Sequence, residues 1–282
     1  MTRFQRPLGT IVGLTALLAT AGCEQATAPN VTRAATVDAT SSAANLDITP
    51  TTTFAEVNQL SPEFVEELMS LQPIRGRDRN FRFSQPIFAQ PAAMPVIFHR
   101  LIDLEESQVN RVALASSLRT NRGPWQELAL ELLGTEEDAS VRMGLMRSLE
   151  KSQPDVLPRA IVLGLTDADA RVRDWAAQGA VQLFANHDGA GATEELRASL
   201  VERLNDEDAG VRATTVRALS FTGQVAYVDA MAALLSDDDG LTRLAAIDAL
   251  VRLDAAEAKR RVDAAQLVGD ADPRVARAAS RL

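Results

Sequence analysis

The chain has 282 residues, of which 46% are apolar but only 4% aromatic, so its core must be built mainly from alanine, leucine and other aliphatic side chains. This composition favours interfaces between helices and predicts an all-α protein. The formal net charge of −9 disfavours nonspecific nucleic-acid binding, because the phosphate backbone attracts basic surfaces.

Residues 1–22 have the organisation of a secretory signal peptide. Arg3 and Arg6 form a positive n-region, residues 11–19 are largely apolar, and the small residues Ala21 and Gly22 end the segment. The apolar stretch is too short for a stable membrane span. Removal of residues 1–22 would leave 27 basic and 38 acidic side chains, a net charge of −11.

Cys23 is the only cysteine, and it follows the expected signal directly. It resembles the lipidated cysteine of bacterial lipoproteins, although Thr20 stands where that family prefers leucine. With Glu24 and not aspartate next, the resemblance implies an outer-membrane lipoprotein facing the periplasm. The alternative is cleavage after Ala21 at an A-x-A site, which would give a secreted soluble protein.

Two segments separate Cys23 from the regular part of the chain. Residues 23–53 are rich in alanine, threonine and serine without helical or strand periodicity, which predicts a disordered tether. Residues 54–94 are expected to form an N-terminal capping segment, since a solenoid must cover the open apolar face of its first repeat. A partner-binding arm is the alternative. Within this segment, Ser61 and Pro62 are expected to start a capped amphipathic helix.

Residues 95–282 contain a pattern that occurs six times. Its reference position, here called position zero, recurs at intervals of 32, 31, 39, 31 and 33 residues: Val109, Val141, Val172, Val211, Thr242 and Val275. Mostly apolar residues at −11, −7 and +4 predict two amphipathic helices in each repeat. An acid at −3 is expected to cap each second helix: Glu106, Asp138, Asp169, Asp208, Asp239 and Asp272.

Position +1 is arginine in the four middle copies, Arg142, Arg173, Arg212 and Arg243. At residues 167–173 and 206–212 the chain resembles the short HEAT repeats of the phycobilisome-lyase-like class. This resemblance implies a right-handed α-solenoid of six two-helix repeats. It also implies that these arginines bridge to turn aspartates of the neighbouring repeat in a ladder. Asn110 and Ala276 replace the arginine at the two ends, which fits capping repeats.

The interval of 39 residues locates an insertion at residues 186–192. Insertions in repeat proteins occur in loops at one edge of the solenoid. A tolerated surface loop is therefore expected, and a functional protrusion is the alternative.

The sequence contains no recognisable catalytic set. His99 and His187 have no cysteine or histidine nearby at ligand spacing, so a zinc site has no ligand set. Phosphate loops, nucleophile elbows and dinucleotide fingerprints are also missing. Residues 237–240 weakly resemble a calcium loop, but its twelfth position would be Asp248, inside an expected helix. We therefore expect neither enzyme activity, nor a metal, nor a cofactor.

Positions +2, +6 and +10 of the second helices point away from the apolar face, and the resemblance places these helices on the concave side of the solenoid. Eight basic and two acidic residues occupy them, a net charge of +6. We call this set the basic ridge: Arg111, Arg119, Arg147, Lys151, Arg217, Arg252, Arg277 and Arg281, with Asp174, Asp248 and the flanking Trp175. The ridge predicts docking of a protein with an acidic segment. The alternative is that cations late in a helix only stabilise its dipole.

The sequence as a whole predicts a non-enzymatic interaction scaffold of the bacterial envelope, with a lipid anchor as its only membrane contact. The alternatives are an accessory subunit of an envelope enzyme and a self-assembling structural protein.

Overall fold

The structure is a computed structural model that describes residues 52–75, 81–83, 90–118, 125–150, 152 and 155–282. The chain divides into two compact units, Met1–Val37 and Asp38–Leu282, and every described residue belongs to the second. The expected signal peptide at 1–22, Cys23, tether residues 24–51, and the ridge residues Arg119 and Lys151 therefore lie outside the described residues.

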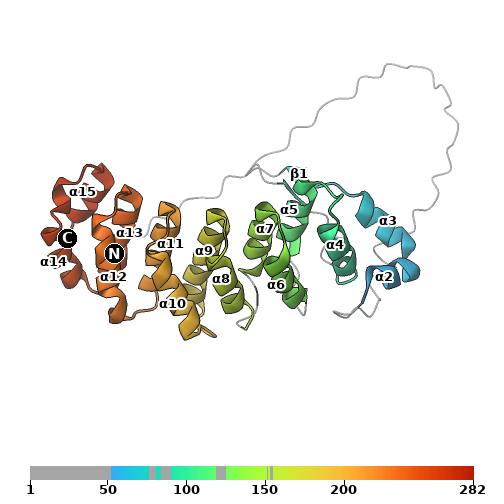
Figure 1. The fold of residues 1–282 in the computed structure, drawn as a ribbon, viewed down its shortest axis with the longest axis horizontal. Helices are drawn as coiled ribbons and strands as arrows, with labels where there is room; N and C mark the ends of the chain where they lie inside the picture. The colour runs from blue at the N-terminus through green and yellow to red at the C-terminus, as the bar shows by residue number, and fades with distance from the viewer. Residues whose placement is uncertain (1–51, 76–80, 84–89, 119–124, 151, 153–154) are drawn as a thin grey trace, which may run out of the picture. The chain divides into compact units, whose positions relative to one another are not determined.

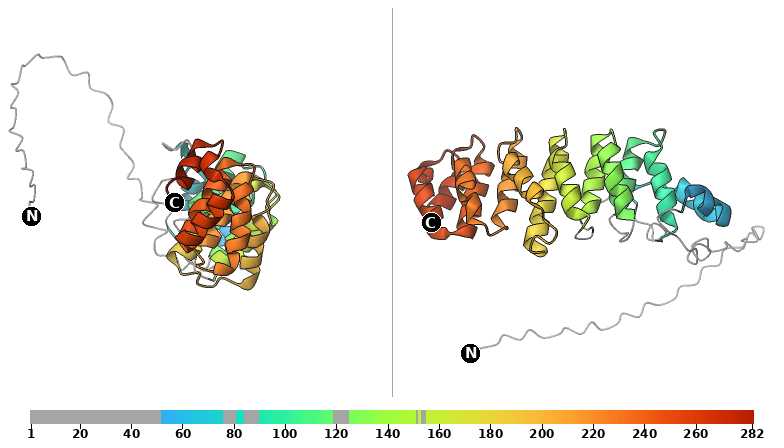
Figure 2. Two further views of the ribbon diagram at one scale, coloured as in Figure 1. Left: turned by 90° about the vertical axis from the view of Figure 1, so that its left-hand side faces the viewer. Right: turned by 60° about the horizontal axis from the view of Figure 1, so that its bottom comes forward.

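Six pairs of helices follow one another in a row, which confirms the predicted α-solenoid (Figure 1). The first helices of the pairs are α4 (Ala93–Ile102), α6 (Trp125–Thr135), α8 (Leu157–Leu165), α10 (Glu194–Arg203), α12 (Val228–Ala233) and α14 (Ala255–Ala264). The second helices are α5 (Gln108–Ser117), α7 (Ala139–Leu149), α9 (Ala170–Asn186), α11 (Ala209–Ser220), α13 (Gly240–Leu253) and α15 (Pro273–Ala279). Each second helix packs against the next second helix along the row (Figure 2).

Three short 3₁₀ segments complete the last two pairs: η3 (Val225–Tyr227), η4 (Leu234–Ser236) and η5 (Leu267–Gly269). Gln266 adopts a left-handed conformation, with φ of 56°, just before η5. This break changes which residues face the core. Val268, expected at an apolar position, is 56% exposed, and Leu267 is buried in its place.

The expected apolar face of the first helices is buried in the central repeats. Positions −11 and −7 are at most 3% exposed in the third to fifth pairs: Ile161, Leu165, Leu200, Leu204, Met231 and Leu235. In the second pair Leu133 is buried, whereas the neighbouring Gly134 is exposed. Because these side chains pack against the adjacent pair, each repeat depends on its neighbours for a closed core.

Residues 54–75 form α2 (Phe54–Leu60), α3 (Pro62–Ser70) and strand β1 (Ile74–Arg75), which pairs antiparallel with β2 (Phe81–Arg82). Both helices contact α4. Arg100 of α4 is only 2% exposed and donates hydrogen bonds to the carbonyl oxygens of Leu68 (2.7 Å) and Leu71 (3.1 Å). The predicted cap of α3 is incomplete, because the buried Ser61 hydroxyl makes no capping hydrogen bond.

The insertion lengthens α9 to 17 residues and continues in a loop up to Thr193, the N-cap of α10. The loop turns through residues with positive φ: Asp188 (50°), Gly189 (70°) and Gly191 (75°). Glycine and aspartate tolerate this region better than most residues, which explains why the chain can reverse here.

Candidate functional site

Aspartates begin the second helices of the last five repeats. Each accepts hydrogen bonds from backbone N–H groups of the first helical turn, as Asp138 does from Ser140 (2.8 Å) and Val141 (3.2 Å). The same geometry holds for Asp169, Asp208, Asp239 and Asp272. These contacts satisfy N–H groups that have no partner within the helix.

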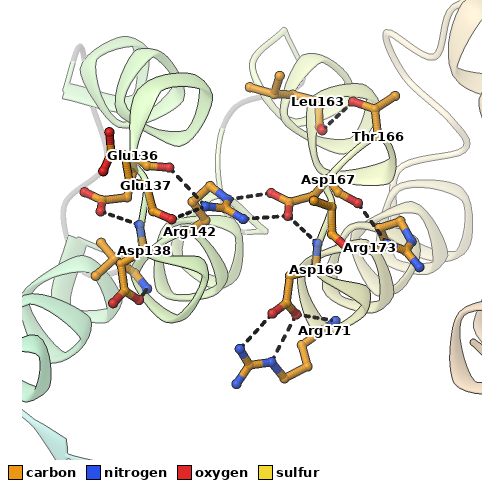
Figure 3. Close-up of polar contacts among 12 residues, drawn as sticks. Glu136, Glu137, Asp138, Arg142, Leu163, Thr166, Asp167, Asp169, Arg171 and Arg173 are labelled. Atoms are coloured by element: carbon orange, nitrogen blue, oxygen red, sulfur yellow. Dashed lines mark hydrogen bonds and ion pairs between the residues drawn. The ribbon is translucent and has the colours of Figure 1, made fainter.

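The arginine at position +1 connects the turn between the helices of its own repeat to the corresponding turn of the next repeat. The Nε and Nη2 atoms of Arg142 both donate to the carboxylate of Asp167, at 2.6 and 2.8 Å (Figure 3). Its Nη1 donates to the carbonyl oxygens of Glu136 and Glu137, in its own turn. One guanidinium therefore fixes the spacing of two neighbouring repeats through a forked charge-assisted contact.

The same contact recurs along the row, with three further pairs: Arg173 with Asp206, Arg212 with Asp237, and Arg243 with Asp270. The acids in these pairs lie five residues before position zero, two residues before the capping aspartates. Each also accepts the N–H of the capping aspartate, as Asp167 does from Asp169 at 2.8 Å. We call these arginine–carboxylate contacts the ladder.

Arg111 belongs to the ladder and not to the basic ridge. It is 7% exposed, and its Nη2 lies 2.5 Å from a carboxylate oxygen of Glu136. The sequence alignment of the first copy was wrong by one residue, since Val109 is 44% exposed whereas Asn110 is 7% exposed. The first repeat therefore has a ladder arginine, and only Ala276 at the other end lacks one.

The N-cap of α5, the second helix of the first repeat, also differs from the prediction. Ser107, not Glu106, accepts the backbone N–H of Asn110, at 3.2 Å. The carboxylate of Glu106 instead accepts from Arg100 at 2.8 Å and from the side-chain amide of Asn110 at 2.6 Å. It thereby links α4 to α5.

Several carboxylates of the ladder and the caps have a lowered pKa. Hydrogen bonds from Arg171 lower the pKa of Asp169 to about 2. Burial raises the pKa of Asp206, but hydrogen bonds from Arg173 and a backbone N–H outweigh it, so the net pKa is lowered. The pKa of Asp237 is lowered in the same way, against burial, by Arg212. These carboxylates are therefore ionised at neutral pH, and they accept hydrogen bonds from arginines and backbone N–H groups of the same chain.

The remaining described ridge arginines lie on the accessible side of the second helices or, in the case of Arg281, just past the end of α15. Arg217, Arg252, Arg277 and Arg281 are exposed, and Arg147 is half-buried. Among the residues that the structure describes, no ion pair joins any of these five to a carboxylate, in contrast to every ladder arginine.

Two ridge arginines instead lie over aromatic rings of the neighbouring second helix. The guanidinium of Arg147 is 5.3 Å from the ring centroid of Trp175, and that of Arg252 is 4.1 Å from that of Phe221. Such contacts hold a cation in place without neutralising its charge. The acids of the ridge are few: Asp174 accepts from the Thr214 hydroxyl at 2.6 Å, and burial raises the pKa of Asp248.

The described residues include no group of three or more potential metal ligands. In the same part of the chain, no helix combines the length and the apolarity that a membrane span requires.

A sequence model for HEAT repeats matches residues 162–251 and 197–282. No match was found among curated proteins. Among solved structures, the crystal structure of an engineered protein is similar, with 18% identity over 66% of this chain and 94% of that chain, and a TM-score of 0.45. From residue 162 onward, the chain is built of HEAT repeats.

Proposed function

We propose that the protein is a scaffold that holds an acidic segment of a partner protein along its basic ridge. HEAT repeats generally act as protein-interaction scaffolds, which supports a protein partner. The observation that carries the proposal is the contrast between two sets of arginines. The ladder arginines form ion pairs with carboxylates, whereas Arg147, Arg217, Arg252, Arg277 and Arg281 form none with a described carboxylate, although the charge of Arg252 acts on nearby Asp248.

The charge balance of the whole chain strengthens this contrast. A protein of net charge −9 has an excess of acids, yet five arginines remain without such partners on one face of the second helices. Complementary charge steers an acidic segment to this face and repels it from the rest of the surface. The alternative is that these arginines only stabilise the helix dipoles. That role requires one cation near the C-terminus of each helix, but it does not require the cations of successive helices to share a face.

The Arg147→Glu/Arg217→Glu variant is expected to lose its partner. The full-length protein and the variant serve as baits for solubilised envelope, and quantitative mass spectrometry compares the captured proteins. A protein that binds the ridge is expected to be absent from the proteins captured by the variant, which lacks the attracting charges. It is also expected to be absent from the proteins captured by the native bait at high salt, which screens those charges.

The control is Arg159→Glu/Arg260→Glu, which makes the same charge change on the first helices, where both arginines are exposed. It should retain the partner. Equal capture by both variants, with both folded by circular dichroism, would contradict the ridge as the docking surface.

We also propose that the protein is tethered to the envelope through a lipidated Cys23, with residues 24–53 as the spacer. The position of the only cysteine directly after an apolar leader supports this. The native protein is expected to incorporate an alkyne-tagged fatty acid and to sediment with membranes, and Cys23→Ser to do neither. Unlabelled native protein in the soluble fraction would favour the secreted alternative.

A further inference from the structure

The turn between α4 and α5 carries three exposed apolar side chains. Ile102 is 58% exposed, Leu104 is 81% exposed and Val109 is 44% exposed. The acids Asp103 and Glu105 lie between and beside them and are exposed as well. We call these five residues the turn patch. Soluble proteins rarely leave apolar side chains grouped in water, and such a group with polar residues around it is typical of a contact site.

Leu104 has no counterpart in the other repeats. Because Asn110 is the buried position zero of the first repeat, Leu104 stands at position −6. The same position is small or polar in the other five repeats: Thr135, Thr166, Asn205, Ser236 and Gly269. The turn therefore does not need a large apolar side chain in order to fold. A leucine that is 81% exposed adds little to the core, so its role is a contact outside the chain.

The two acids of the turn patch are not used in the way that other turn acids are. The carboxylate of Asp103 accepts the backbone N–H of Glu105 at 3.0 Å, and among the described residues neither acid forms an ion pair. The neighbouring Glu106, in contrast, is bound to Arg100 at 2.8 Å. Carboxylates beside apolar side chains are repelled by anionic lipid headgroups and attracted by a basic protein surface.

The ridge is a surface with the complementary properties. Arg217 and Arg252 are exposed on it, and no ion pair joins either one to a described carboxylate. Position +2 lies on the same face, and there Met143 of α7 and Leu244 of α13 are half-buried. Acids with apolar side chains on one surface thus match cations with apolar side chains on the other.

A molecule cannot make this contact with itself. The turn patch is held by α4 and α5, and α5 packs against α7, so the turn is fixed in the same row of helices that carries the ridge. A contact between the two surfaces therefore joins two molecules.

We propose that the acidic segment held by the ridge is the turn patch of a second copy of this chain. The proposal rests on the proposed function, since the ridge is the docking surface in both. The net charge of −9 on each copy does not prevent the contact, because salt at physiological strength screens charges more than about 8 Å apart. The two surfaces are unlike, so the contact is heterologous and extends into a chain or closes into a ring.

The test measures capture of one copy by another. Full-length protein with two different affinity tags is mixed in detergent, and the native copies are expected to capture each other. Two variants are each expected to lose capture of their own copies: Arg147→Glu/Arg217→Glu in the ridge, and Asp103→Asn/Leu104→Ser/Glu105→Gln in the turn patch. A mixture of the two variants is expected to recover capture, because the first has an intact turn patch and the second an intact ridge.

Leu104→Ser alone is expected to weaken self-association at least about ten-fold, because one exposed leucine is no longer buried in the contact. Val225→Ser is the matched control. Val225 lies in η3 and is 75% exposed, so its loss is expected to leave the dissociation constant unchanged. Microscale thermophoresis of a fluorescently labelled copy against an unlabelled one gives both constants.

Three results would overturn the proposal: native copies that do not capture each other, a folded turn variant that still captures its own copies, and a variant mixture without recovery. The proposed function fails by a different result, which is that the ridge variant captures the same envelope proteins as the native bait. Loss of envelope proteins by the ridge variant, with no self-association of native copies, would leave the proposed function standing and exclude the second copy as the partner.

Discussion

Replacing Arg173 with alanine is expected to lower the free energy of unfolding by about 3–5 kcal/mol. The side chains of Arg173 and Asp206 are only 5% and 1% exposed, so this is the most buried contact of the ladder. The substitution removes both forked hydrogen bonds to Asp206 and the bonds to the carbonyl oxygens of Asp167 and Ala168. It leaves a buried carboxylate without its main counter-charge. Urea denaturation followed by far-UV circular dichroism measures the change.

Arg171→Ala provides the matched control, two residues earlier on the same helix. The Arg171 side chain is 59% exposed and pairs only with Asp169, so its loss is expected to cost at most about 1 kcal/mol. Arg173→Met/Asp206→Leu should recover most of the stability lost in Arg173→Ala, because it removes both buried charges. If Arg173→Ala costs no more than Arg171→Ala, the ladder does not hold the repeats together.

Acidification is expected to lower the free energy of unfolding by about 2–5 kcal/mol between pH 5 and pH 2. The pKa values of Asp169, Asp206, Asp237 and Asp270 are lowered in the folded protein. A carboxyl with a lowered pKa stabilises the folded state fully above its unfolded pKa of about 3.9, and this contribution is lost as the pH falls through the folded value. Urea midpoints should therefore change little from pH 7 to pH 5 and fall below about pH 4.

Asp169→Asn isolates one of these groups. Asparagine is also a good N-cap, so the variant keeps the cap of α9 but loses the charge that pairs with Arg171. The native protein should be the more stable at pH 6, and the two should converge near pH 2, since the pKa of Asp169 is about 2. A difference in stability that does not change with pH would show that ionisation of Asp169 contributes nothing.

The helical repeats were predictable because their signal is local and occurs six times. Apolar residues four apart identify a buried helix face wherever they occur, as Ile161 and Leu165 show. The first and last copies misled the prediction for physical reasons. In the first, Ser107 caps the helix one residue later than expected, and in the last, Gln266 breaks the helix with a left-handed residue.

The candidate site was predictable only in part. The 100° rotation of a helix was enough to place Arg217 and Arg252 on an exposed face. The ladder from each arginine to a turn aspartate of the next repeat was predicted, and the hydrogen bonds confirm it. Which turn acid accepts was not predicted, although the sequence carries the signal, an acid two residues before each capping aspartate, as with Asp167 and Asp169. The contacts of arginines with Trp175 and Phe221 depend on distances between neighbouring repeats, and these distances do not follow from periodicity.

The ladder also determines where additional residues can be inserted into the chain. Arg142 and Asp167 are 25 residues apart, whereas Arg173 and Asp206 are 33 apart, because the insertion lies between them. Both forks have nevertheless nearly the same lengths, 2.6 and 2.8 Å in one and 2.8 and 2.8 Å in the other. The additional residues leave the register of the repeats unchanged. The loop at residues 187–193 is therefore a natural point for grafting a foreign segment, such as a reporter peptide, with the solenoid intact on both sides.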